Sequence, residues 1–301
     1  MKTTHKAGFV NIVGNPNAGK STLMNALLGE KLSIVTPKAQ TTRHRVMGLL
    51  NGPDYQIVYS DTPGALDPRY KLQEGMMKAV GSALVDADLL LLVVDLSDTS
   101  PIQPKLLENL KKTKVPVFVL LNKVDLVGFE KSNEAFQYWN SELPQAKIFP
   151  VSALAKIYTA EILTEILAVL PESPPYFPKD ELSDRSTRFF ISEIIREKIL
   201  LLYEREIPYS CEVVVNEFKD EETIIRISAT IYTERESQKR ILIGHQGSMM
   251  KRLGTKARHD IESFLGKKVF LELHVKVDEN WRNDATRLRA YGYLDSDNKV
   301  N

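Results

Sequence analysis

The 301-residue chain is long enough for two domains, and 43% hydrophobic residues with 8% aromatic residues are typical of a globular protein, which argues against extended disorder. A formal net charge of +1 gives no indication of a nucleic-acid or membrane partner. The single cysteine, Cys211, cannot form an internal disulfide and no Cys/His cluster has zinc spacing, so we expect a reducing compartment and no structural zinc.

The ends and apolar runs of the chain contain no export or membrane signal. Residues 1–6 lack both an apolar signal core and an Arg-rich amphipathic presequence. The longest apolar run, 87–94, is interrupted by Asp88 and is far shorter than the ~18 residues that a membrane span needs. We therefore expect a cytosolic protein.

An apolar, β-rich run at 9–13 leads into an eight-residue loop, after which the apolar residues have helical spacing. A loop whose backbone N–H groups open onto a helix N-terminus can neutralise a phosphate chain. The alternative is a chance glycine turn before a helix. We expect Lys20 to contact the β/γ-phosphates and the Ser21 hydroxyl to bind Mg²⁺. The predicted phosphate loop consists of Gly14, Asn15, Pro16, Asn17, Ala18, Gly19, Lys20 and Ser21.

Strand-like and helix-like segments alternate from this loop to about residue 170, a pattern that predicts a parallel sheet with helices on both faces. Ligands of such sheets bind beyond the carboxyl ends of the strands. The sequence Asp61, Thr62, Pro63, Gly64 follows one predicted strand, with a carboxylate for Mg²⁺ and a glycine N–H for the γ-phosphate. Alone, it is equally consistent with a simple Pro-Gly turn.

Two further strand ends predict a guanine site. Asp125 can accept from the ring N–H and the exocyclic amine of guanine, a donor pair that adenine lacks. Asn122 would brace the loop and the N7 edge, and the Lys123 stem would pack on the base plane. Ser152 and Ala153, with the residue after them, would supply a backbone N–H to the guanine O6 atom.

The four prolines between 171 and 178 mark a domain boundary, because this segment cannot continue a helix and favours an extended, stiff connector. Beyond it the predicted order is helix, strand, strand, helix, helix, strand, which gives a three-stranded sheet with helices on one face.

The motif Gly-His-Gln-Gly at 244–247 separates two predicted helices and resembles the Gly-x-x-Gly loop of a type II KH module. Its alternative is a helix C-cap followed by a turn. Eight basic residues against two acidic ones lie between Lys239 and Lys268, which favours single-stranded RNA over a merely solvated helix face. The predicted RNA-binding residues are Ile243, Gly244, His245, Gln246, Gly247, Met250, Lys251, Arg252 and Lys256.

The ordered G-domain motifs resemble those of translation-factor-type GTPases, and the segment 40–44 resembles the first switch of the bacterial Era GTPases. In such a switch one of Thr41 and Thr42 binds Mg²⁺, and we favour Thr42, which gives Ser21, Thr42 and Asp61 as metal ligands. The catalytic residues implied are Lys20, Thr42, Asp61 and Gly64.

The resemblance carries one departure from Ras-like enzymes, which orient the attacking water with a glutamine after Asp-x-x-Gly. Here the position is Ala65, so slow unaided hydrolysis is expected. Several relatives of this type use a potassium ion, for which Asn17 is the matching asparagine. Arg43, Arg45 and Arg69 are candidate arginine fingers, although we prefer to interpret them as surface charges.

The Era-family resemblance implies a G domain over 1–173, a proline-rich linker over 174–186, a type II KH domain over 187–282 and a tail over 283–301 that we cannot place. It further implies a monomeric GTP/GDP and Mg²⁺ switch that binds the 3′ end of 16S rRNA, assists assembly of the 30S ribosomal subunit and associates peripherally with the inner face of the cell membrane. The competing hypothesis is a GTPase scaffold whose C-terminal domain binds protein or anionic membrane.

Overall fold

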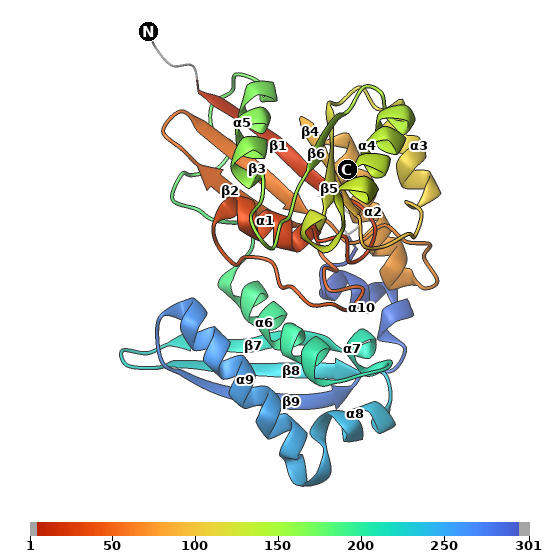
Figure 1. Ribbon diagram of the computed structural model, residues 1–301. Helices are drawn as coiled ribbons and strands as arrows, with labels where there is room; N and C mark the ends of the chain where they lie inside the picture. The colour runs from red at the N-terminus through yellow and green to blue at the C-terminus, as the bar shows by residue number, and fades with distance from the viewer. Residues whose placement is uncertain (1–4, 295–301) are drawn as a thin grey trace, which may run out of the picture. The chain divides into compact units, whose positions relative to one another are not determined.

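The computed structural model describes residues 5–294, and the chain divides into two compact units between Asp184 and Arg185, apart from the short segment Tyr70–Leu72. Figure 1 shows the elements of both units. In the described part of the chain, no helix combines the length and apolar character needed to cross a membrane.

The first unit is built on a six-stranded sheet with the order β2-β3-β1-β4-β5-β6. Only β2 and β3 pair antiparallel, because the short turn between them forms a hairpin; every other neighbouring pair is parallel. The mostly parallel sheet predicted from the sequence is therefore confirmed. The strands are β1 (Lys6–Val13), β2 (Val46–Asn51), β3 (Tyr55–Asp61), β4 (Leu89–Asp95), β5 (Val117–Asn122) and β6 (Lys147–Pro150).

Helices cover both faces of this sheet (Figure 1). One apolar cluster packs α1 (Lys20–Leu28) and α5 (Thr159–Val169) against one face. A second cluster packs α2 (Lys71–Val85), α3 (Pro104–Lys112) and α4 (Phe129–Glu142) against the other. Because both faces are covered, the central strand β4 reads Leu-Leu-Leu-Leu-Val-Val-Asp rather than alternating.

The proline-rich segment predicted as a linker is bound to the edge of the first unit. The Gln56 side chain accepts from the backbone N–H groups of Tyr176 and Phe177 at 2.7 and 3.0 Å. Further along, Leu49 donates its N–H to the Leu182 carbonyl at 3.0 Å. The segment thus extends the β2 side of the sheet up to Asp184, and the division between the units falls within the span 174–186 predicted as the linker.

The second unit is a three-stranded sheet, β7-β8-β9, with helices on one face, as predicted. β7 and β8 are antiparallel, whereas β8 and β9 are parallel because two helices separate them. The elements are α6 (Thr187–Leu202), α7 (Ile207–Ser210), β7 (Glu212–Asp220), β8 (Ile225–Thr233), α8 (Glu236–Ile243), α9 (Ser248–Leu265) and β9 (Val269–Val277). Cys211 is buried in this core.

The chain after β9 is part of the second unit, although its role could not be assigned from the sequence. Trp281 is fully buried and donates its indole N–H to the Ser210 carbonyl at 3.1 Å. Asp284 caps α10 (Ala285–Ala290) with its side chain. Tyr293 donates its hydroxyl to Glu212 at 2.6 Å. Part of the predicted tail, residues 295–301, lies outside the described residues. So do residues 1–4 of the N-terminal segment that was examined for a signal sequence.

Candidate functional site

The loop between β1 and α1 has the conformation that its glycines predict. Gly19 has φ +98°, and a Cβ on it would lie 2.3 Å from the side-chain nitrogen of Asn122, so the position accepts no larger residue. Lys20 begins α1 and is buried. Its ammonium group donates to the carbonyls of Gly14 at 3.2 Å and Asn15 at 2.8 Å.

The electrostatics of Lys20 are dominated by its burial. Burial lowers the pKa of Lys20 to about 8, and the carboxylate of Asp61 opposes only part of this shift. Two carbonyl dipoles are a weak substitute for a counter-ion. The side chain is therefore held ready for a strongly anionic ligand.

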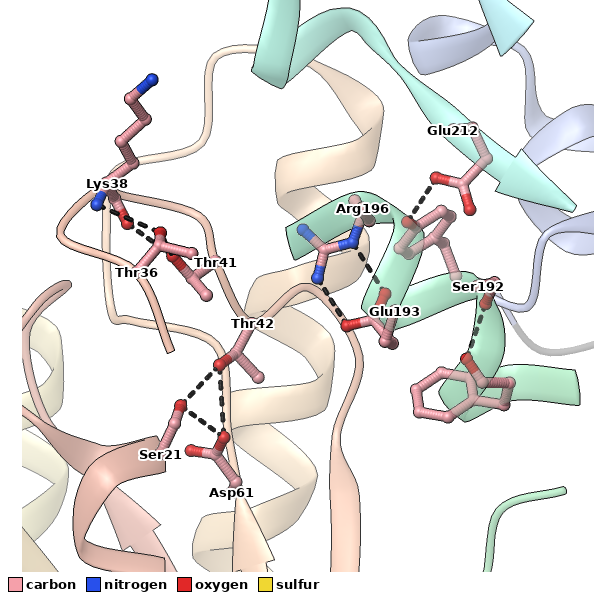
Figure 2. Close-up of polar contacts among 12 residues, drawn as sticks. Ser21, Thr36, Lys38, Thr41, Thr42, Asp61, Ser192, Glu193, Arg196 and Glu212 are labelled. Carbon is pink, nitrogen blue, oxygen red and sulfur yellow. Dashed lines mark hydrogen bonds and ion pairs between the residues drawn. The ribbon is translucent and has the colours of Figure 1, made fainter. Parts of the chain in front are cut away.

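Ser21, Thr42 and Asp61 converge at the start of α1, as Figure 2 shows. Ser21 donates its hydroxyl to Asp61 Oδ2 at 2.6 Å, Thr42 donates to the same oxygen at 3.2 Å, and the two hydroxyls are 2.9 Å apart. Thr41 instead donates to the Lys38 carbonyl at 2.6 Å. The geometry therefore brings Thr42, and not Thr41, to the other two predicted metal ligands.

One carboxylate oxygen of Asp61 accepts no hydrogen bond from the described part of the chain. Its Oδ1 atom is buried and makes no hydrogen bond within the described part of the chain. Burial raises the pKa of this carboxyl, against the opposing effects of the Ser21 hydroxyl, of Lys20 and of the nearby Ser33 and Thr42 hydroxyls. An orphaned carboxylate oxygen beside two hydroxyls is the donor set that Mg²⁺ prefers, so these residues fit that ion.

The chain after Asp61 touches the phosphate loop closely. A Cβ on Gly64 would lie 2.5 Å from the Cα atom of Pro16, so only glycine permits this approach. The next residue, Ala65, is buried and donates its N–H to the Gly14 carbonyl at 3.0 Å. No side chain at position 65 reaches toward the phosphate side of the loop.

The predicted base-binding residues are organised by Asn122. Its amide donates to the Ala18 carbonyl at 2.8 Å, and its oxygen accepts the Ala153 N–H at 3.0 Å. The bracing contact predicted for Asn122 is present. Of the residues predicted to supply a backbone N–H to the guanine O6 atom, Ser152 donates its N–H to the Ile157 carbonyl and Ala153 donates its N–H to Asn122. Lys123 has φ +67° and pairs with Asp95 at 2.5 Å, while Asp125 is exposed.

Most of the predicted nucleotide-binding residues line one cavity of about 660 Å³, the size of a cofactor site. The phosphate loop, the first switch segment, Gly64 and both base-binding loops contribute to its wall. Asp95 and Asp98 also line the cavity and were missed by the motif analysis. Because Asp95 ends the buried strand β4, the rule that ligands lie beyond strand ends could have identified it.

Six predicted residues do not line the cavity: Gly14, Asn15, Ala18, Asp61, Thr62 and Pro63. Two of them, Asn15 and Thr62, shape the loops through their own hydrogen bonds. Asn15 binds the Pro101 carbonyl at 2.8 Å and the Gln103 N–H at 3.1 Å. Thr62 donates its hydroxyl to the Ile12 carbonyl at 2.7 Å.

Asn17, by contrast, lines the cavity and is exposed. Its amide donates to the Pro37 carbonyl at 3.2 Å. This hydrogen bond connects the phosphate loop to the first switch segment.

The three arginines of this region have different environments. Arg69 is exposed, as expected of a surface charge. Arg43 is only 1% exposed, and the Arg45 side chain is 11% exposed. Interpreting the last two as surface charges was therefore wrong, because long-range packing rather than local sequence buries them.

The loop between α8 and α9 in the second unit is open and polar. Gly244 and Gly247 have φ +74° and +76°, and His245 and Gln246 are both exposed at its surface. Gly247 starts α9, an 18-residue helix without a side-chain cap or an acidic residue in its first turn. The Ser248 N–H donates to the His245 carbonyl, so the N–H groups that an anion can reach are those of the residues after Ser248 in the first turn.

Unpaired cations follow this loop along α9. Lys251, Arg252 and Lys256 are exposed and make no ion pair in the described chain, whereas Lys267 pairs with Asp220 at 2.6 Å. Lys267 and Lys268 follow the far end of α9, roughly 27 Å from Gly247. The positive charge of the predicted basic region is thus only partly at the loop. Ile243 and Met250, also predicted there, are half-buried.

Comparison with known families assigns both units. Residues 9–123 match the family described as 50S ribosome-binding GTPase, and residues 206–282 match the KH domain. GTPase Era of Syntrophus aciditrophicus is 45% identical over 96% of this chain and 95% of the relative, and GTPase Era of Staphylococcus haemolyticus is 42% identical over 97% and 99%.

Solved structures agree. A crystal structure of Era in complex with MgGDPNP and nucleotides 1506–1542 of 16S ribosomal RNA has a TM-score of 0.92 and 38% identity, covering 96% of this chain and 99% of that one. A single-residue variant of Aquifex aeolicus Era bound to GDP·AlF4⁻ has a TM-score of 0.90 and 37% identity over the same shares.

The fold, the phosphate loop and the KH unit define a GTP hydrolase with an appended nucleic-acid-binding domain. Within that class, the chain belongs to the Era family of GTPases, as near full-length relatives above 40% identity show. The resemblance inferred from the motifs is confirmed.

Nucleotide binding should be linked to proton uptake at alkaline pH. Burial lowers the Lys20 pKa to about 8 in the free protein, whereas phosphate favours the charged ammonium. GDP affinity is then constant below that pH and falls as the pH rises above it. Calorimetry at about pH 8.5 in two buffers of different ionisation enthalpy measures the proton. Lys20→Met controls for protons taken up by the nucleotide; equal uptake by both proteins would contradict the assignment.

Proposed function

We propose that this protein is a GTP-hydrolysing switch that binds single-stranded RNA at the 3′ end of 16S rRNA and thereby assists assembly of the 30S subunit. The relative of known structure that carries both MgGDPNP and 16S nucleotides supports this role. The observation in this chain that carries it is the pairing of a complete nucleotide cavity with an uncapped, cation-flanked helix in the second unit.

In the nucleotide site, Lys20 and the loop N–H groups bind the phosphates, and Ser21, Thr42 and Asp61 hold Mg²⁺. The ion supplies positive charge that offsets the negative charge of the phosphates. Gly64 allows the backbone to approach the γ-phosphate. Asp125 selects guanine over adenine, and Lys123, held by Asp95, packs on the base.

Hydrolysis is slow without help, since Ala65 is buried and carries no group to orient water. We infer that Asn17, exposed on the phosphate loop beside the first switch segment, helps to place a K⁺ ion that stabilises charge on the transferring phosphoryl group.

The K⁺ inference predicts faster GTP hydrolysis in KCl than in NaCl at equal ionic strength. Replacing Asn17 with Ala should remove this difference while leaving GTP affinity little changed. Single-turnover rates in the two salts measure the effect. Equal rates for the wild-type protein in both salts would eliminate the ion.

The RNA site uses the first turn of α9 and the exposed cations behind it. Backbone N–H groups after Gly247 bind the sugar-phosphate chain, and Lys251, Arg252 and Lys256 add attraction that weakens with salt. His245 and Gln246, at the surface of the loop, lie beside the strand path.

Replacing Gly247 with Asp should abolish RNA binding, because the carboxylate faces the phosphate path, and should leave GTP hydrolysis intact. Gly266→Asp is the matched control: both glycines have positive φ and open space at the Cβ position, so both variants carry the same backbone strain. RNA titrations by fluorescence anisotropy separate them. If Gly247→Asp binds RNA as well as Gly266→Asp does, the competing scaffold function is favoured.

The bound proline-rich segment offers a route from nucleotide to RNA. Met47 lies just after the first switch segment, at the second residue of β2. Its N–H donates to the Asp184 carboxylate at 3.0 Å, and the Ser183 hydroxyl donates to its carbonyl at 2.5 Å. Ser186, two residues beyond Asp184, caps α6 of the KH unit. Ordering of the switch by GTP therefore acts directly on the chain that leads into the RNA-binding unit.

This route predicts that a non-hydrolysable GTP analogue raises RNA affinity at least about fivefold over GDP. The double substitution Ser183→Ala, Asp184→Ala should bring that ratio close to one with hydrolysis unchanged. Lys179→Ala, which removes contacts of the same segment with the Gly52 and Pro53 carbonyls, is the control. Equal RNA affinities of the wild-type protein in both nucleotide states would refute the coupling.

We also infer a monomer in the cytoplasm that associates peripherally with the inner face of the cell membrane. The Era-family membership supports the cytoplasmic placement. The exposed cations of α9 form a surface to which anionic lipid can bind. Binding of anionic vesicles, measured in competition with RNA, distinguishes lipid binding from RNA binding at this surface.

A further inference from the structure

We propose that Arg45 is a positioning residue: it fixes the junction between the first switch segment and β2, and so keeps Thr42 within reach of Ser21 and Asp61. The inference rests on the proposed Mg²⁺ ligands and adds a residue that does not touch nucleotide or metal. It starts from the burial of an arginine that the sequence pattern placed on the surface.

The Arg45 guanidinium group joins three elements of the first unit. Nε donates to the Ser60 hydroxyl of β3 at 2.5 Å. Nη1 and Nη2 donate to the two oxygens of Asp86, just beyond α2, at 2.5 and 3.0 Å. Nη2 also donates to the side-chain oxygen of Asn11 on β1 at 3.3 Å. The contacts with Asp86 are bidentate, which only an arginine can make.

The partners of Arg45 are themselves fixed. Asn11 and Ser60 are fully buried, and the Asn11 amide donates to the Ala83 carbonyl and to Asp86 Oδ1, both at 2.7 Å. Arg45 therefore occupies a preformed polar site formed by Asn11 of β1, Ser60 of β3 and Asp86. A lysine retains the charge and loses the fork that meets Ser60, Asn11 and Asp86 together.

The location of these contacts explains what they control. Arg45 precedes Val46, the first residue of β2, which lies opposite Asp61 in the β2–β3 register. Ser60, bound by Nε, is the neighbour of Asp61. Thr42 is three residues before Arg45, a short span, so an anchored Arg45 limits how far the Thr42 hydroxyl can move from Asp61.

Arg45 should therefore affect only one of two contributions to GTP binding, the one that depends on Mg²⁺. The hydrogen bonds of Arg45 described above go to β1, β3 and Asp86, and not to the phosphate loop or the guanine loops. The contribution of Mg²⁺ requires Thr42 and Asp61 to be held together. Loosening Arg45 should therefore weaken the Mg²⁺-dependent part of GTP binding and leave the Mg²⁺-independent part unchanged.

The test uses the full-length protein and a fluorescent, non-hydrolysable GTP analogue. The dissociation rate of the analogue is measured in Mg²⁺ and in EDTA, and the ratio of the two rates gives the Mg²⁺ contribution. Asp86→Asn keeps an acceptor for Asn11, removes the charge facing Arg45, and alters a side chain that is 47% exposed, so the fold is retained. Arg45→Lys is the second variant, and Arg69→Lys is the control.

Both variants should lower the EDTA-to-Mg²⁺ rate ratio about tenfold, the loss typical when a group that orients metal ligands is removed. Amide hydrogen exchange at 41–46 in the analogue complex should also accelerate, with EDTA rates and the thermal midpoint close to those of Arg69→Lys. Unchanged ratio and exchange in both variants would overturn the role of Arg45. A wild-type ratio of one would instead refute the metal assignment itself and this inference with it.

Discussion

A single buried carboxylate, Asp61, is the constraint on which the nucleotide-binding unit depends. One of its oxygens accepts the Ser21 and Thr42 hydroxyls, and the other is buried with no protein donor in the described chain. Leaving such a group unsatisfied costs about 1–3 kcal/mol or more. Three contacts hold Asp61 in place despite this cost. Asp61 is the last residue of β3, its neighbour Ser60 is bound by Arg45, and α1 brings the Ser21 hydroxyl to it. A divalent cation relieves the penalty, so metal binding and order of the first switch segment favour each other.

In the second unit the corresponding feature is an excess of donors. Gly247 opens α9 with neither a capping side chain nor an acidic residue in the first turn, and nearby cations make no ion pairs in the described residues. In the proposed function, each unit contains a site completed by a ligand of opposite charge: a metal with anionic nucleotide in one, a sugar-phosphate chain in the other. The coupling proposed above runs through the segment ending at Asp184, which contacts the strand that follows the first switch.

Much of the fold and of the candidate site could be predicted from the sequence, because these features depend on residues that are close together along the chain. The strands and helices follow from the periodicity of the apolar residues. The motif positions follow from glycines such as Gly19 and Gly64, where a neighbouring residue lies too close to leave room for a Cβ atom. What the sequence left open or placed wrongly depends on contacts distant in sequence. Thr41 and Thr42 are equivalent in pattern and differ only in which faces Asp61. Arg45 is half-buried through its contacts with Asn11 and Asp86, residues 34 and 41 positions away.

The most direct test of the account replaces Asp61 with Asn, which retains the shape and removes the charge. Calorimetric affinities for a non-hydrolysable GTP analogue are measured with Mg²⁺ and with EDTA. The account predicts that Mg²⁺ tightens binding by the wild-type protein and has no effect on the variant, while the affinity in EDTA is the same or higher because a negative charge near the phosphates is gone. If Mg²⁺ tightens binding of the variant by the wild-type factor, Asp61 does not hold the metal and the account is wrong.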